Sequence, residues 1–137
     1  MSFGKATASA AKTFRTRQDG SMTLEAVLWV PAFLAFFAIS ADVALMFHGQ
    51  AMAQRVVQDA NRNASSGYFR TRQAVEDDIL ARVQSFSPNA RVVTDYGSDY
   101  VRSTVELPAS DLVATGLFTA FVNLDVPASA YHRLEIW

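Results

Sequence analysis

The chain has 137 residues, with 12 basic side chains, 13 acidic side chains and no cysteine, and half of its residues are hydrophobic. This composition excludes a disulfide scaffold, a cysteine-ligated zinc site and a strongly basic nucleic-acid-binding protein, and the length favours at most one domain. The first 20 residues carry a net charge of +3, whereas the remaining 117 carry −4. A basic head, an apolar run and an acidic remainder are typical of a chain sorted across a membrane.

The predicted leader, residues 1–20, ends at a glycine just before the apolar run. Gly20 is followed five positions later by Glu25. This junction resembles the cleavage signal of type IV prepilins, in which a membrane aspartyl peptidase cuts after the glycine. The resemblance implies a processing site between Gly20 and Ser21, with Ser21 as the new N-terminus. A glycine suits such a site because it leaves the scissile carbonyl unobstructed.

The segment from Ala26 to Phe47 is the longest hydrophobic stretch and contains one charged residue, Asp42. As a helix its 22 residues rise roughly 33 Å, enough to cross a hydrocarbon core of about 30 Å. Its strongly apolar side chains favour insertion by about 5 kcal/mol, against a cost of at most ~3 kcal/mol for Asp42. We therefore predict a transmembrane helix over residues 21–47, with a cytoplasmic N-terminus and everything beyond it outside.

Two other interpretations of this region stay open. A secretory signal peptide cut after Ala53, in the pattern Ala51-Met52-Ala53, would release a soluble binding module that begins at Gln54, and the segment 38–40 offers a weaker cleavage pattern. An uncleaved anchor would instead present an adaptor domain to another envelope complex. The apolar run is longer than a secretory core of 7 to 15 residues, which argues against the signal peptide.

Three residues of the apolar helix are candidates for an assembly role. When such helices bundle, the carboxylate of Glu25 can neutralise the new amine of a neighbouring subunit; the attraction is roughly 4 kcal/mol before desolvation. Alternatively, Glu25 only complements the helix dipole in the first turn. Pro31 removes a helical hydrogen bond and predicts a kink. Asp42 is either an interfacial acid or a helix-contact residue.

Beyond the Gly20 junction, several residues occur in a characteristic order: Glu25, Pro31, Asp42, Gln50-Ala51 and Ala60-x-Arg62. This order resembles the TadE-like family of the Flp (Tad) type IVb pilus system. The resemblance implies a minor pilin or pseudopilin of the bacterial inner membrane, with a periplasmic C-terminus, that acts in pilus assembly. Major Flp pilins have a tyrosine where this chain has Ala26, and they are much shorter. TadF-like and TadG-like roles stay open.

The resemblance also implies the partners. They are other pilins or pseudopilins, the pilus assembly machinery, the prepilin peptidase and membrane lipid, with no nucleic acid. Whether the chain enters the fibre and whether it adheres to a surface stay open at this point.

Outside the membrane we expect an α+β, pilin-like fold, in which the long N-terminal helix packs on a small antiparallel sheet. The helix should continue over residues 48–66, and residues 67–137 should form the small α+β domain. Its elements, predicted from hydrophobic periodicity and turn signals, are a helix over 72–85, strands over 91–95 and 100–107 joined by a hairpin loop, a short helix over 110–118, and strands over 121–126 and 129–136.

The sequence predicts no enzyme, no metal site and no cofactor. His48 and His132 are the only histidines, and neither lies in a metal-binding or phosphate-binding motif. His48 is predicted to be an interfacial anchor at the membrane exit.

Overall fold

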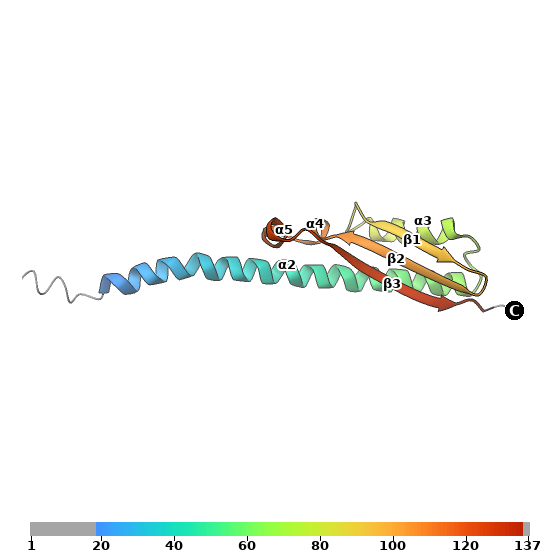
Figure 1. Ribbon diagram of the computed structural model, residues 1–137, viewed down its shortest axis with the longest axis horizontal. Coiled ribbons are helices and arrows are strands. Elements are labelled where there is room, and N and C mark those ends of the chain that lie inside the picture. The colour runs from blue at the N-terminus through green and yellow to red at the C-terminus, as the bar shows by residue number, and fades with distance from the viewer. Residues whose placement is uncertain (1–18, 136–137) are drawn as a thin grey trace, which may run out of the picture. The chain divides into compact units, whose positions relative to one another are not determined.

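The computed structural model describes residues 19–135, with side chains from Thr23 onward. Its elements are shown in Figure 1 and follow in the order α2 (Asp19–Ser65), α3 (Arg72–Val83), β1 (Arg91–Tyr96), β2 (Tyr100–Pro108), α4 (Ala109–Leu112), α5 (Leu117–Phe121) and β3 (Asp125–Arg133). The chain divides into two compact units between Phe37 and Ala38, so α2 contributes to both.

Helix α2 is a single helix of 47 residues that contains Pro31. It ends at Ser65, where the amides of Ser66 and Gly67 bond back to carbonyls of the last turn and Gly67 adopts a φ of 82°. Glycine is favoured in such a left-handed C-terminal cap because it has no Cβ. The predicted continuous helix is therefore confirmed.

The second half of α2 buries one narrow stripe of side chains, spaced three or four residues apart as expected for one helix face. The stripe consists of Asp42, Met46, Gly49, Ala53, Val57, Ala60, Asn61 and Ala64. Half of these residues are glycine or alanine, which allows close approach of other segments. At Gly49, an added Cβ would lie 2.6 Å from Cδ2 of Leu112, so the glycine makes room for α4.

The three strands form one antiparallel sheet in the order β1-β2-β3. On β2, the side chains of Val101, Ser103, Val105 and Leu107 are buried and alternate with more exposed ones. This buried face packs against α2 and α3, and α3 contributes Val75, Ile79 and Val83 to the same core. The predicted pilin-like α+β fold, with a long N-terminal helix packed on an antiparallel sheet, is confirmed (Figure 1).

The connection from β2 to β3 differs from the sequence prediction. The expected single helix over 110–118 is two short helices, because Val113 after α4 is extended and Gly116 before α5 adopts a left-handed φ of 71°. Phe121 ends α5 and does not begin a strand. The two expected C-terminal strands are one strand, because Pro127 is tolerated within an edge strand, where a missing N–H costs little.

Candidate functional site

The predicted assembly residues fall in both compact units. Glu25 and Pro31 lie in the N-terminal unit, where every side chain from Thr23 to Phe37 is exposed. Gly20 and Ser21 lie in the first turn of α2, and their side chains are outside the described set. Residues 1–18 of the predicted leader also fall outside it. The structure therefore places Glu25 and Pro31 together on an uncovered apolar helix.

Asp42 belongs to the C-terminal unit and is fully buried. Its Oδ1 accepts hydrogen bonds from the backbone N–H groups of Ala114 (3.1 Å) and Thr115 (2.8 Å). Its Oδ2 accepts from the Thr115 hydroxyl (2.6 Å) and the Phe118 N–H (3.3 Å). The Asp42 carboxylate belongs to α2, but it accepts hydrogen bonds from backbone N–H groups around the start of α5. An N-cap side chain does the same within its own helix. Within the chain, Asp42 is a contact between helices.

Three amide side chains join α2 to the edge strand β3. Gln50 donates to the carbonyl of Pro127 (3.0 Å), Gln54 to that of Ser129 (2.6 Å) and Asn61 to that of Ala130 (2.9 Å). Backbone groups at a sheet edge would otherwise be open to pairing with another strand. These bonds therefore fasten the helix along the strand and cover backbone acceptors there.

Asn61 also begins a buried hydrogen-bonded chain across the sheet. Its Oδ1 accepts from the Ser103 hydroxyl at 2.6 Å, and the Ser103 oxygen lies 3.0 Å from the Thr94 hydroxyl. Because the single Ser103 proton is used toward Asn61, Thr94 must be the donor to Ser103. All three side chains are at most 1% exposed. The chain of bonds fixes α2 against β2 and β1.

Sequence reasoning singled out Gln50 but not Asn61, which occupies the unspecified position in Ala60-x-Arg62. The available signal was periodicity, because Asn61 lies four residues after the buried Val57. An asparagine at a position spaced for the core indicates a buried polar contact. Its partners are distant in sequence, so they could not be named.

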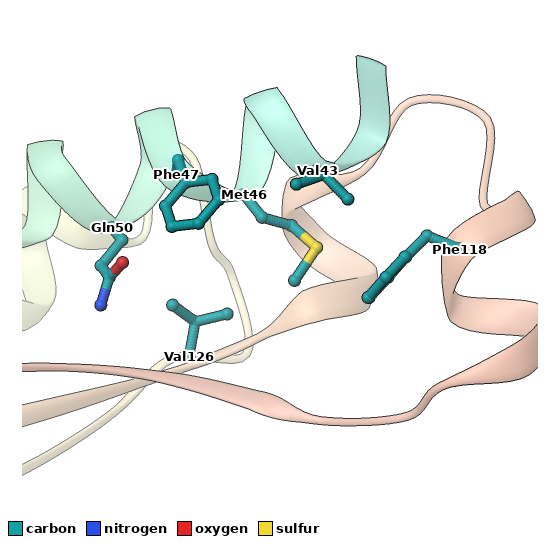
Figure 2. A pocket seen from close by; sticks show the side chains of 6 residues that line it. All are labelled: Val43, Met46, Phe47, Gln50, Phe118 and Val126. Atoms are coloured by element: carbon teal, nitrogen blue, oxygen red, sulfur yellow. The ribbon is translucent and has the colours of Figure 1, made fainter. Parts of the chain in front are cut away.

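An apolar groove lies beside the Asp42 contact. It has a volume of about 230 Å³ and is lined by Val43, Met46, Phe47, Gln50, Phe118 and Val126. Figure 2 shows the Met46 side chain extending from α2 into the space bordered by Val43, Phe118 and Val126. Phe47 is 67% exposed. The groove is therefore an apolar surface at the point where α5 meets α2.

A second carboxylate, the half-buried Asp111, organises the turn before β1. Asp111 accepts hydrogen bonds from the Ser87 hydroxyl (2.9 Å) and from the backbone and side-chain nitrogens of Asn89 (both 3.0 Å). Burial alone would raise the pKa of Asp111, but the hydrogen bonds from Asn89 and Ser87 favour the charged form and lower the pKa below its ordinary value.

This lowered pKa predicts acid sensitivity of the turn. The folded carboxyl binds its proton less tightly than the unfolded one, so its stabilisation is complete above about pH 4 and is lost as the pH falls through the folded pKa. We expect amide exchange at Asn89, corrected for the intrinsic pH dependence, to accelerate in that range. Asp111→Asn should remove this response, measured by hydrogen exchange with mass spectrometry. An unchanged response in Asp111→Asn would contradict the assignment.

Among the described residues, no group of three His, Cys, Asp or Glu side chains is placed to hold a metal ion. His48 is exposed, and His132 lies in β3, paired with Val101 of β2.

A model of the TadE-like protein family matches residues 20–62. The matched segment begins at Gly20 and includes Glu25, Pro31, Asp42 and Asn61. It ends three residues before the last residue of α2. No curated protein and no solved structure shows significant similarity to the chain.

Proposed function

We propose, from the match of residues 20–62 to the TadE-like family, that this chain is a minor pilin or pseudopilin. It acts structurally in the assembly of a type IVb pilus and is processed by a prepilin peptidase after Gly20. The observation that carries the proposal is the two-part construction of α2. Its first part is apolar and uncovered just after the Gly20–Glu25 junction, and its second part is fastened to an antiparallel sheet.

The proposal places the first part of α2 in the bacterial inner membrane. Within the described residues, the segment Thr23–Ser65 contains one stretch long and apolar enough to span a bilayer. The proposed span ends before residue 47, the end predicted from the sequence, because Asp42 and Met46 are buried in the C-terminal unit. The 19 residues from Thr23 to Ala41 rise about 28 Å, close to the thickness of a hydrocarbon core. The positive leader would stay in the cytoplasm, and the domain that begins near Asp42 would lie in the periplasm.

Glu25 is the proposed contact to other subunits. Its side chain is exposed near the start of an apolar helix, where an unpaired carboxylate is costly in lipid and an amine from a neighbouring N-terminus would neutralise it. The partners would then be other pilins, together with the assembly machinery and the peptidase. Pro31, one helical turn and a half further on, would ease local unwinding of the helix on assembly.

The position of Ala53 argues against the secretory alternative. Ala53 is fully buried in the stripe that packs α2 against the rest of the domain. Cleavage after Ala53 would separate Asp42, Met46 and Gly49 from a domain whose contacts they complete. A segment that belongs to the folded unit is a poor candidate for removal.

Processing is tested by N-terminal sequencing of the chain made in cells with active prepilin peptidase. We expect the wild type to begin at Ser21 and Gly20→Val to keep its leader. Ser21→Ala, altered on the other side of the same bond, should still be cut. A mature N-terminus at Gln54, or an uncut wild type beside a processed control prepilin, would overturn the proposed processing.

A further inference from the structure

The exposed apolar side chains of the C-terminal unit gather near one end of it. From residue 38 onward, the described chain has nine exposed large hydrophobic residues, and six of them fall in two short segments, 45–47 and 117–124. These six are Leu45, Phe47, Leu117, Phe121, Val122 and Leu124. Phe121 is 81% exposed, and α5 has no buried residue. Phe118 of α5 is partly buried against the core, but Leu117 and Phe121 are exposed. The helix therefore has an apolar surface available for another environment.

The sequence around α5 is free of charge. The 13 residues from Leu112 to Leu124 include no Asp, Glu, Lys or Arg, and the run is bounded by Asp111 and Asp125. The other uncharged runs of similar or greater length in the described chain both lie on α2: Ala26–Ala41, in the proposed membrane span, and Val43–Gln54, directly after Asp42. The run at α5 is too short to cross a bilayer, but a segment of this kind can lie at its surface.

Asp42 fixes the position of this run along α2. The hydrogen bonds from Thr115 and Phe118 hold the start of α5 against Asp42, the first charged residue after the uncharged part of the span. The apolar groove continues from α5 onto the next turn of α2, through Val43, Met46 and Phe47. The exposed side of α5 is thereby held at the level where α2 would leave the hydrocarbon core.

We propose that α5 and residues 122–124 form an interfacial membrane anchor, which inserts its apolar side chains into the periplasmic leaflet beside the exit of α2. The occupant of this surface is bilayer lipid, and the inference rests on the membrane placement proposed above. Interfacial helices bury their apolar face about 5–10 Å deep. Because the run has no basic residue, insertion should depend on apolar burial and be nearly independent of anionic lipid content.

Site-directed spin labelling of the full chain in phospholipid vesicles tests this anchor. The sequence has no cysteine, so Phe121→Cys provides a single site for a nitroxide. Val93→Cys is the matched control, because Val93 is also an exposed apolar residue (66%) but lies on β1. Leu34→Cys, with Leu34 64% exposed in the proposed span, reports insertion of α2.

We expect oxygen to relax the labels at 34 and 121 several-fold more effectively than a water-soluble nickel chelate, with the order reversed at 93. The result at 121 should be the same in zwitterionic vesicles and in vesicles with anionic lipid. A label at 121 that responds to the chelate while the label at 34 does not would overturn the anchor and leave the membrane placement intact. Chelate access at both positions would overturn both. A label at 121 shielded from both reagents would indicate protein contact and also overturn the anchor.

Discussion

Replacing Asn61 with alanine should lower the free energy of unfolding of the C-terminal unit by about 2–4 kcal/mol. The change removes two hydrogen bonds: the one that Asn61 Nδ2 donates to the Ala130 carbonyl, and the one that Asn61 Oδ1 accepts from the Ser103 hydroxyl. It leaves the buried Ser103 hydroxyl without its acceptor, with Thr94 as its one remaining partner. Urea dependence of amide exchange in β2, measured on the full chain in detergent micelles, reports the loss.

Asn63→Ala is the matched control, because Asn63 lies on the same helix two residues further on but is exposed. The same substitution there should change the free energy of unfolding by no more than about 0.5 kcal/mol. When Ser103→Ala is combined with Asn61→Ala, part of the lost free energy of unfolding should be recovered. Removing both hydrogen-bond partners costs less than leaving one of them buried and unsatisfied. Equal effects of Asn61→Ala and Asn63→Ala would show that the buried chain of hydrogen bonds contributes nothing measurable.

The regular elements were predictable because their signals are local. The end of α2 followed from Ser65-Ser66-Gly67, and the hairpin followed from the loop after Tyr96, whose glycine and aspartate separate two runs of β-forming residues. Helical spacing beyond Phe47 also indicated that one helix would continue from the apolar segment into the C-terminal unit. The α+β fold and the long helix packed on a sheet were therefore readable from the chain.

The contacts that organise the site were not predictable, because they join distant parts of the sequence. The Asp42 carboxylate binds the backbone of Thr115, 73 residues away, and Asn61 binds Ser103, 42 residues away. In sequence Asp42 is surrounded by apolar residues, a pattern that fits an interfacial acid somewhat better than a contact residue and names no partner. The predicted single helix over 110–118 was wrong for a related reason, because the N–H groups of Ala114, Thr115 and Phe118 bond to the distant Asp42 carboxylate.

Asp42→Asn should loosen α5 selectively, because the two oxygens of Asp42 have different partners. The amide oxygen of the new asparagine can keep the hydrogen bonds from the N–H groups of Ala114 and Thr115. Its NH₂ group then faces the N–H of Phe118, and two donors cannot form a hydrogen bond. The Thr115 hydroxyl can turn and accept, so it adapts. We expect amide exchange at Phe118 to accelerate by roughly tenfold or more, with smaller changes at Ala114 and Thr115.

Asp42→Ala should extend the faster exchange to all three amides, because no acceptor is left for any of them. Asp59→Asn serves as the control on the same helix, since the Asp59 side chain is 62% exposed and pairs with Arg82 of α3. It removes an acidic charge without touching the chain between β2 and β3, so exchange over residues 114–118 should stay at the wild-type rate. If Asp42→Asn left Phe118 as protected as in the wild type, the carboxylate would not be what holds α5 against α2. The spin label at residue 121 gives a second readout, the ratio of its relaxation by oxygen to its relaxation by the nickel chelate. The proposed anchor requires this ratio to fall in Asp42→Ala. An unchanged ratio would show that the carboxylate does not hold α5 at the membrane.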